Sequence, residues 1–308
     1  MTTLHRRDIL KLFLLAPALG PGACAAVRSG AVPSSAALAA LEKAHGGRLG
    51  VCVLDTGTRA MLHWRGDERF ALCSTFKLLL AASVLQAIGR GELDAGAGIG
   101  FGETDLVPHA PVVEANLRAG ITQMTALELA EAAQTTSDNV AANLLIRALG
   151  GPDALTAGWR ARGDAISRLD RWEPELNEVA PGDHRDTTTP CAMARHVATL
   201  VGGDMLAPGL RGLLRRWLVD TRTGLGRLRA GLPPAWEAGD KTGTGVGTGL
   251  PNRLNDVAVA WPPGRAPLVI AAYYEAPQSG FGRLREQEAV FPAIARIAAA
   301  WAQARPPR

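Results

Sequence analysis

The sequence predicts an α/β fold of the α+β kind, in which the two ends of the chain build a sheet and the middle builds a helical lobe. Near the N-terminus, residues 49–54 and 60–64 flank the turn of a hairpin. Near the C-terminus, three strands are expected over residues 241–249, 256–261 and 268–274. Because the block between them is helical, we expect the two terminal portions to join in one sheet layer against an all-helical lobe.

The helices are predicted from apolar periodicity and from the residues that end them. Residues 36–45 place Leu38 and Leu41 on one face and stop at Gly46-Gly47. Residues 75–88 are nearly all apolar, which predicts a buried helix. Further helices are expected over residues 125–149, with a break at 135–139, and over 191–201, 209–220 and 284–304, whereas residues 89–120 are rich in glycines and turns.

A long segment over residues 165–190 contains prolines and aspartates and shows little periodicity. A loop of that length inside a compact domain is usually functional or disordered. With 47% hydrophobic and 20% charged residues, the chain has the composition of a globular protein with a substantial core. We expect one domain over about residues 35–304, with an α/β lobe at 35–70 and 220–304 and a helical lobe at 71–219.

Residues 1–26 predict an export signal that is removed. A charged start precedes the apolar run Leu12–Leu19 and the small residues at 23–26. The pair Arg6-Arg7 favours a twin-arginine signal, which carries folded cargo, although an ordinary secretory signal with two chance arginines fits the same pattern. A lipidated Cys24 is the remaining alternative. We therefore expect an exported, periplasmic protein that is off the membrane unless Cys24 is lipidated.

Charge and cysteine content exclude several functional classes. The formal net charge is +4, and +2 of it lies in the removed segment, which leaves too little positive charge to predict nucleic-acid binding. The mature chain keeps Cys52, Cys73 and Cys191 without a CxxC motif or a Cys/His cluster, so no metal site is predicted. One disulfide among the three and buried free thiols remain alternatives, and the sequence does not select a pair.

Ser74-Thr75-Phe76-Lys77 places a serine three residues before a lysine at the start of the buried helix. The chain has four lysines among its 33 basic residues, so a lysine in such a motif suggests a need for a cation that can lose its proton. The spacing puts both side chains on one helix face, where Lys77 can activate Ser74 as a nucleophile. A helix start also offers unpaired N–H groups to a developing oxyanion. On its own, however, this spacing is common in helices.

Two further motifs carry polar chemistry. Ser137-Asp138-Asn139 supplies a hydroxyl and an amide in the break between two helices, where the same residues also favour an N-cap. Lys241-Thr242-Gly243 is expected to open a strand after a turn at Gly239-Asp240, and glycine there lets a substrate approach the backbone. Each motif has an ordinary structural explanation, but their conjunction with the serine–lysine motif makes independent coincidence improbable.

The three motifs together resemble the signature of class A β-lactamases and penicillin-binding proteins. Within the long loop, residues 171–177 are similar to the E-x-E-L-N element of the class A enzymes, and Arg171 and Asp186 match the ion pair that closes that loop. The resemblance covers about residues 35–304 and implies a β-lactamase catalytic domain. It implies an antiparallel sheet of about five strands flanked by N- and C-terminal helices, with the active site between the sheet and the helical lobe.

The resemblance also implies a role for each matching residue. Ser74 is the nucleophile, and either Lys77 or Glu173, acting through water, is the base for acylation. Glu173 is also the base that hydrolyses the acyl-enzyme. The remaining implied roles are an oxyanion hole from the N–H groups of Ser74 and Thr244, proton transfer to the leaving nitrogen by Ser137, positive charge from Lys241, and substrate binding by Asn139, Asn177, Thr242, Gly243, Thr244, Arg227 and His109.

Four positions depart from the family pattern or have a second explanation. His109 stands where the family commonly has an aromatic residue at the rim of the site, so the stacking wall is altered. Residues 245–251 are longer and richer in glycine than expected after K-T-G. Gly245 occupies the place of the cysteine that pairs, in some carbapenem-hydrolysing relatives, with the residue matching Cys73, so that disulfide is expected to be absent. Arg227 equally fits a surface arginine in an Arg-rich chain.

We expect this protein to hydrolyse the amide bond of penicillins and cephalosporins through a serine acyl-enzyme, giving antibiotic resistance. The resemblance implies a monomer without a cofactor. Two alternatives remain: a D,D-peptidase-like penicillin-binding protein that acylates but barely turns over, and a catalytically dead binding protein on the same scaffold. Glu173 disfavours the first, and the complete set of polar residues disfavours the second.

Overall fold

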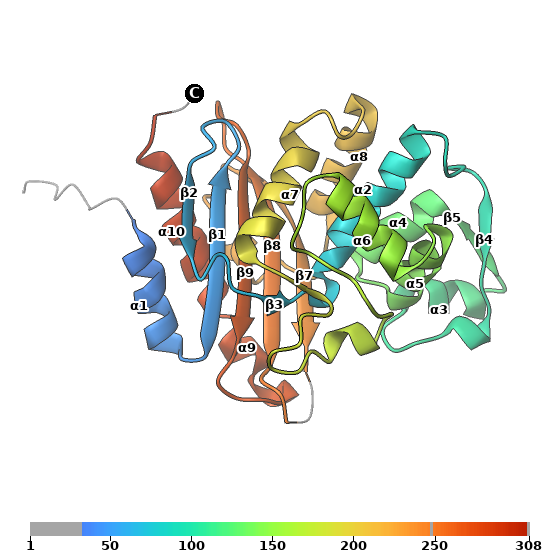
Figure 1. Ribbon diagram of the computed structural model, residues 1–308, viewed down its shortest axis with the longest axis horizontal. Coiled ribbons are helices and arrows are strands. Elements are labelled where there is room, and N and C mark those ends of the chain that lie inside the picture. The colour runs from blue at the N-terminus through green and yellow to red at the C-terminus, as the bar shows by residue number, and fades with distance from the viewer. Residues whose placement is uncertain (1–32, 247–248, 307–308) are drawn as a thin grey trace, which may run out of the picture. The chain divides into compact units, whose positions relative to one another are not determined.

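The computed structural model describes residues 33–246 and 249–306, and the expected export signal lies outside these ranges. Strands from both ends of the described chain meet in one antiparallel sheet in the order β2-β1-β9-β8-β7 (Figure 1). This confirms the predicted five-stranded sheet. Its strands are β1 (Arg48–Asp55), β2 (Met61–Trp64), β7 (Glu237–Gly245), β8 (Arg253–Trp261) and β9 (Leu268–Glu275).

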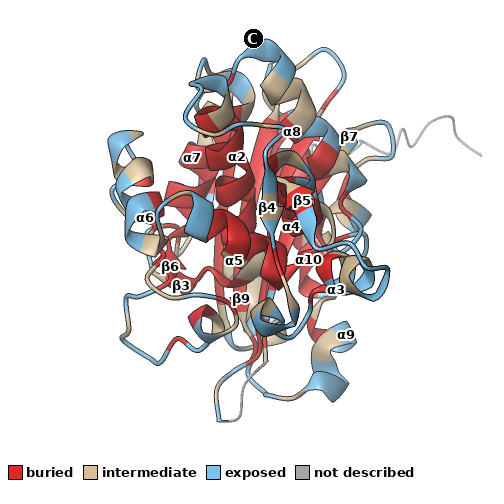
Figure 2. Cartoon of the chain, turned by 90° about the vertical axis from the view of Figure 1, so that its right-hand side faces the viewer, coloured by how far each residue is buried: buried red, intermediate tan, exposed pale blue. Residues whose placement is uncertain are grey.

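Helices cover both faces of the sheet, which explains why β1 is buried along almost its whole length. Val51 and Val53 pack in one apolar cluster with α1 (Ser35–His45) and α10 (Val290–Gln303). Cys52 and Leu54 alternate to the opposite face, where they join the cluster that contains the central helices. The sheet therefore separates a layer of terminal helices from the helical lobe, and the elements at the centre are buried (Figure 2).

The helix α2 (Phe76–Gly89) runs through the middle of the helical lobe. Every residue from Phe76 to Ala87 is buried, so this helix is surrounded by other elements on all sides, as its apolar sequence predicts. The helices packed against it are α4 (Ala126–Thr135), α5 (Asn139–Ala148), α6 (Pro152–Ala161) and α8 (Pro208–Asp220), while α7 (Pro190–Gly202) packs on β1 and β9. Two short strand pairs, β3 (Phe70–Ala71) with β6 (Thr187–Thr188) and β4 (Gly98–Gly100) with β5 (Gln123–Thr125), complete the lobe.

The predicted break between α4 and α5 is confirmed, and Asp138 explains it. One carboxylate oxygen of Asp138 accepts a hydrogen bond from Ala141 N and so caps α5. The other accepts from Val112 N and Val113 N at 2.9 and 3.0 Å, at the start of α3 (Pro111–Arg118). Asp138 thus fixes the connection in which Ser137 has a positive φ of 64°.

Several predicted boundaries are wrong. β7 runs from Glu237 to Gly245 rather than over residues 241–249, and β8 begins at Arg253 rather than at Asp256. Gly239-Asp240 is not a turn, because both residues pair with β8 opposite Val259 and Ala258. The lysine motif therefore lies within the strand. The expected helix over residues 284–304 is divided into α9 (Leu284–Gln287) and α10. Pro292 accounts for the division, since its ring clashes with the carbonyl four residues earlier in a continuous helix.

Two further helices were not predicted from the sequence. The glycine-rich region 89–120 contains α3, and α6 follows α5 after only three residues. Each begins with a proline at its first position, Pro111 and Pro152, which is a common helix start. Within the described ranges, no helix has both the length and the apolar character needed to cross a bilayer.

Candidate active site

Ser74 lies at the edge of a buried polar cluster between the sheet and the helical lobe. It is on the 3-10 turn Cys73–Thr75, directly before α2, and is partly exposed while its two neighbours are buried. Its Oγ accepts a hydrogen bond from Lys77 Nζ at 3.0 Å and donates one to Glu173 Oε1 at 3.2 Å. The hydroxyl therefore contacts a basic and an acidic group at the same time.

Lys77 is the centre of this cluster and is completely buried. Besides Ser74, its ammonium donates to Ser137 O at 2.8 Å and to Asn139 Oδ1 at 2.5 Å. It also lies 3.0 Å from Glu173 Oε1. Burial lowers the pKa of Lys77, and the negative charges of Glu173 and Asp138 oppose that shift. A lysine held this way can exchange a proton with its neighbours more readily than an exposed one.

Lys241 brings a second buried ammonium to the same cluster, from the middle of β7. Its Nζ donates to Ser137 Oγ at 3.0 Å and to Thr242 O at 2.9 Å. Burial, and secondarily the nearby charge of Lys77, lowers the pKa of Lys241 to about 7. The Ser137 hydroxyl is thus between two lysines, with Lys77 Nζ 3.5 Å away on the other side.

Glu173 enters the cluster from the long loop and is buried. Its Oε2 accepts a hydrogen bond from Asn177 Nδ2 at 2.6 Å, so the carboxylate bridges Asn177 and Ser74. The loop is closed by the expected ion pair, since Arg171 Nε lies 2.6 Å from Asp186 Oδ2. Asp186 also accepts from the backbone N–H of Arg171 at 3.0 Å, which fixes the base of the loop.

Asn143 is a residue of the site that the sequence analysis missed. Its side chain makes two hydrogen bonds to the backbone of Glu173: Asn143 Oδ1 accepts from Glu173 N at 3.0 Å, and Asn143 Nδ2 donates to Glu173 O at 2.9 Å. It lies one helical turn after Asn139 on α5, so both amides are on the same face of the helix. That spacing is the signal by which it could have been found.

β7 approaches Ser74 closely at Gly243. A Cβ atom at Gly243 would lie 3.2 Å from Ser74 N and 3.0 Å from Leu72 O, so a side chain at this position would press on the turn that carries Ser74. The next residue, Thr244, is exposed at the end of the strand. Thr242 directly precedes Gly243 on β7, and its Oγ1 shares a hydrogen bond of 2.7 Å with Thr223 Oγ1.

Arg227 is buried, which excludes its interpretation as a surface arginine. Its guanidinium donates to Gly243 O at 3.0 Å, to Thr244 Oγ1 at 2.7 Å and to Asn255 O at 2.7 Å. It also forms an ion pair with Glu288 at 2.8 Å. Arg227 therefore braces the end of β7 and contacts the Thr244 hydroxyl directly.

His109 lies apart from this cluster. It is exposed, has a positive φ of 65°, and its Nε2 is 3.1 Å from Thr136 O. Its own carbonyl accepts a hydrogen bond from Asn139 N at 2.9 Å. The connection of His109 to the site therefore runs through the backbone of Asn139 and not through its ring.

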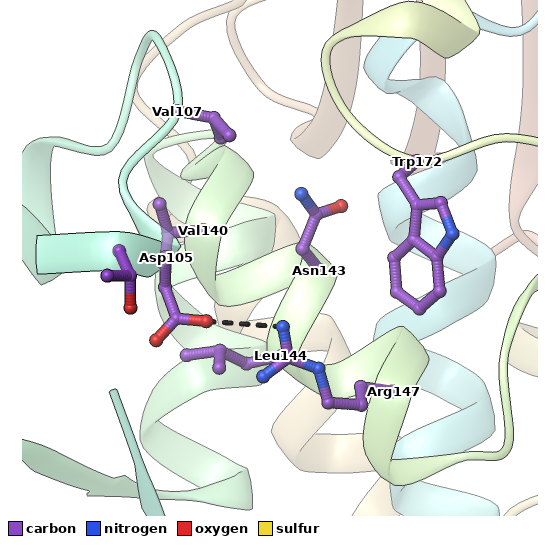
Figure 3. A pocket seen from close by; sticks show the side chains of 8 residues that line it. Asp105, Val107, Val140, Asn143, Leu144, Arg147 and Trp172 are labelled. Atoms are coloured by element: carbon purple, nitrogen blue, oxygen red, sulfur yellow. Dashed lines mark hydrogen bonds and ion pairs between the residues drawn. The ribbon is translucent and has the colours of Figure 1, made fainter. Parts of the chain in front are cut away.

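A cavity of about 250 Å³ lies beside the cluster, between α5, the loop before α3 and Trp172 (Figure 3). Arg147 and Asp105 form an ion pair of 3.2 Å across it. Asn143 is the point of contact with the site, because it lines the cavity and also holds the backbone of Glu173. Ser74, Lys77, Ser137 and Glu173 do not line this cavity.

The structure thus brings most of the predicted residues together and leaves one at a distance. Hydrogen bonds connect Ser74, Lys77, Ser137, Asn139, Glu173, Asn177 and Lys241. Thr242, Gly243 and Thr244 come after Lys241 on β7, and Arg227 is hydrogen-bonded to Thr244. Cys73 is a buried free thiol, and a Cβ at Gly245 would lie 3.2 Å from its Sγ. Within residues 33–246 and 249–306, no three His, Cys, Asp or Glu side chains are placed to hold a metal ion.

A family model described as the beta-lactamase enzyme family matches residues 33–302. The solved structure of the last common ancestor of Gram-negative bacteria class A beta-lactamase is 52% identical, with a TM-score of 0.81, and the match covers 86% of this chain and 98% of that one. The chain belongs to the class A β-lactamase family.

Curated relatives in this family match most of the chain. The carbapenem-hydrolyzing beta-lactamase KPC of Klebsiella oxytoca is 44% identical over 299 residues, covering 96% of this chain and 97% of the relative. The beta-lactamase AST-1 of Nocardia asteroides is 49% identical over 236 residues, covering 76% and 73%. As a class A β-lactamase, the chain is a hydrolase, and the cluster around Ser74 is its candidate active site.

Proposed function

We propose that this β-lactamase hydrolyses the β-lactam amide of penicillins and cephalosporins through an acyl-enzyme on Ser74. The observation that carries the proposal is the double contact of the Ser74 hydroxyl, with Lys77 on one side and Glu173 on the other. A serine becomes a competent nucleophile when a neighbouring base takes its proton. Both neighbours are within 3.2 Å, and they are also in contact with each other.

In the acylation step, the Ser74 oxygen attacks the β-lactam carbonyl and its proton passes to Lys77, or to Glu173 directly or through a water molecule. The amide nitrogen that leaves then needs a proton. Ser137 supplies it, because its hydroxyl lies between Lys77 and Lys241 and can be reprotonated from Lys77. The backbone N–H groups of Ser74 and Thr244 form the oxyanion hole, and the absence of a side chain at Gly243 lets the two segments lie close enough.

In the deacylation step, Glu173 takes a proton from the water that attacks the acyl carbonyl. Its contact with Asn177 supports this role, because the amide fixes the carboxylate and offers a second polar group to the water. A penicillin-binding protein of the same fold needs only the acylation machinery. The buried Glu173, held at both its side chain and its backbone, therefore favours a hydrolase over an enzyme that remains acylated.

Substrate binding is assigned to the residues around β7 and α5. Lys241 provides positive charge, and the hydroxyls of Thr242 and Thr244 are hydrogen-bond donors for the carboxylate of the substrate. Arg227 adds its charge through Thr244. Asn139 contacts the acylamino side chain of the substrate, and His109, which is exposed and hydrogen-bonded to Asn139 through its carbonyl, is assigned to the rim of the site.

The test is to mix the protein with a chromogenic cephalosporin and to follow both absorbance and intact mass. Steady turnover that disappears in Ser74→Ala is the expected result. A stable adduct on Ser74 without turnover would instead indicate a penicillin-binding protein, and neither adduct nor turnover would indicate a binding protein without catalysis.

We also propose that the protein is exported to the periplasm through the twin-arginine signal in residues 1–26 and acts there as a monomer. The paired Arg6-Arg7 before an apolar run supports this route. Replacing both arginines by lysine is expected to keep β-lactamase activity in the cytoplasmic fraction. Unchanged periplasmic activity would point to an ordinary secretory signal.

A further inference from the structure

Two cysteines that lie 139 positions apart meet between the sheet and the helical lobe. Cys52 is in the middle of β1, and Cys191 is the second residue of α7. Their Sγ atoms are 3.0 Å apart, and both residues are buried in the same apolar cluster. We propose that Cys52 and Cys191 are a disulfide-forming pair that ties the central sheet to α7 when the protein is in an oxidising compartment.

The third thiol of the described chain does not compete for this pairing. Cys73 is the first residue of the turn that carries Ser74, and it packs in a separate cluster with Ala71 and Val179. Burial raises the pKa of the Cys73 thiol to about 12, which keeps it protonated and unreactive at neutral pH. The structure thus separates the three thiols into one adjacent pair and one isolated group.

A metal ion is a poor explanation for the pair. His63 lies directly opposite Cys52 in the β1–β2 pairing, but zinc needs four ligands or three ligands and a water. No cluster of three His, Cys, Asp or Glu side chains suited to a metal occurs within the ranges that the structure describes. Two buried sulfurs in contact, without a third ligand, favour a bond between the sulfurs themselves.

The surroundings favour Cys191 as the attacking thiolate. Its position in the first turn of α7 places it at the positive end of the helix dipole, which stabilises negative charge. The contact with the Cys52 thiol lowers the pKa of Cys191 and raises that of Cys52, so Cys191 loses its proton first. Burial and the negative charge of Asp67 oppose this lowering of the Cys191 pKa, while Arg195, one turn later on α7, adds positive charge that supports it.

The reaction requires a disulfide as oxidant, such as glutathione disulfide or the disulfide of an oxidoreductase. The Cys191 thiolate attacks one sulfur of that disulfide, forming a mixed disulfide and releasing one thiolate. Cys52 then loses its proton and attacks Cys191 Sγ, which forms the Cys52–Cys191 bond and releases the second thiolate. Two protein thiols are thereby oxidised by two electrons, and one disulfide is reduced to two thiols.

Because both thiols are buried, an oxidant reaches the pair only when the edge of the sheet opens. β2 is an edge strand of four residues, and the turn after it covers Cys191 through Gly66. Gly66 O accepts a hydrogen bond from Cys191 N at 2.9 Å, and a Cβ at Gly66 would lie 2.5 Å from Cys191 Sγ. Only glycine fits between this turn and the sulfur, so opening of the short edge strand exposes the thiol.

The bond would enclose most of the catalytic residues. Ser74, Lys77, Ser137 and Glu173 all lie within the loop from Cys52 to Cys191. Closing so long a loop restricts the unfolded chain strongly, so the oxidised protein is expected to unfold at a higher temperature than the reduced one, by on the order of 5 °C.

The experiment uses the full chain, both in its native form and after unfolding and refolding, in a buffer of glutathione and glutathione disulfide. Free thiols are blocked with iodoacetamide, and the protein is digested without reductant for peptide mass analysis. The expected product is a linked peptide pair containing Cys52 and Cys191, with Cys73 alkylated after unfolding. The oxidised and reduced samples are then compared by thermal unfolding.

Three variants make the result specific. Cys52→Ala and Cys191→Ala should each lose the linked peptide and the difference in melting temperature between oxidising and reducing buffer, whereas Cys73→Ala should keep both. Linkage through Cys73, a persistent glutathione adduct on Cys191, or the absence of any linked peptide in both the native and the refolded wild-type protein would overturn the proposal. Equal melting temperatures of the disulfide-linked and the reduced protein would show that the Cys52–Cys191 bond does not stabilise the fold.

Discussion

Lys77 Nζ lies 3.0 Å from Glu173 Oε1, and neither side chain has any exposed surface. Such a pair is stable only when both partners and their hydrogen bonds are present, because each charge alone would be buried without compensation. The pair also links the two halves of the reaction, since Lys77 contacts the nucleophile and Glu173 comes from the loop that is proposed to activate water. Variants that keep shape but change proton transfer are therefore the most informative.

Replacing Glu173 by glutamine should block deacylation more than acylation. The amide keeps the size of the side chain but cannot accept a proton from water. We expect turnover to fall by about 10²–10⁴-fold, the range for loss of a general base. Intact mass after mixing with a penicillin should show the accumulated acyl-enzyme. Glu175→Gln, two residues away and exposed, is the matched control, and normal turnover in Glu173→Gln would rule out Glu173 as the deacylation base.

Replacing Asn143 by alanine should impair catalysis although the residue does not contact Ser74. The backbone of Glu173 loses two hydrogen bonds, so the carboxylate keeps its contacts with Asn177 and Lys77 but is positioned less precisely. A small displacement of a catalytic group costs roughly 10²-fold in rate, so we expect kcat to fall by about that factor with a smaller change in KM. Arg147→Ala, one turn later on α5 and exposed, should leave kcat within a factor of a few of wild type. Equal effects of the two variants would contradict the positioning role.

The pH dependence of substrate capture should report the ionisation of Lys241. Its pKa of about 7 means that the ammonium is charged below that pH and neutral above it. If it attracts a substrate carboxylate, kcat/KM falls as pH rises through this range. In Lys241→Arg the fall should disappear, because the guanidinium stays charged. The measurement is kcat/KM of wild type and variant from pH 5.5 to 9, and an identical alkaline fall in both would assign it to another group.

Replacing Arg227 by methionine should destabilise the protein as well as weaken substrate binding. The variant leaves the carbonyls of Gly243 and Asn255 without their donor and Glu288 without its partner. We expect the free energy of unfolding to fall by about 3 kcal/mol, measured by urea denaturation. Glu288→Gln keeps the arginine and its three other contacts, and it should cost about 1 kcal/mol or less. A larger loss in Glu288→Gln than in Arg227→Met would contradict this account.

The fold could be predicted from the sequence where the apolar pattern was unambiguous. The β1–β2 hairpin, the buried α2 and the break before α5 follow directly from residues 49–64, 75–88 and 135–139. Boundaries failed where tertiary pairing overrode local preference. Gly239-Asp240 has the composition of a turn, yet the ladder to β8 draws both residues into β7. Likewise Pro292 divides the last helix inside a run that is otherwise uniformly helical in character.

The site was predictable to the extent that its chemistry lies in short motifs. Ser74 and Lys77 are neighbours on one helix, so their contact follows from spacing. The meeting of Lys241 with Ser137, 104 residues away, depends on how β7 packs against the helical lobe. Asn143 has only its spacing from Asn139 on α5 as a signal, and the burial of Arg227 has none, because an arginine in an Arg-rich chain looks ordinary until its partners are known. The meeting of Cys52 and Cys191 is of the same kind.

The pairing of β1 with β9 has a consequence for the order of events during synthesis. β1 ends at Asp55, but its partner β9 begins only at Leu268. Lys241 and Arg227 of the active site also belong to the last third of the chain. Contacts between such distant segments form late and slowly. The ribosome must therefore release nearly the whole chain before the central sheet can close, and until then the apolar side chains on both faces of β1 lack part of their packing partners. A truncation that removes β9 should leave an aggregating chain rather than a weak enzyme.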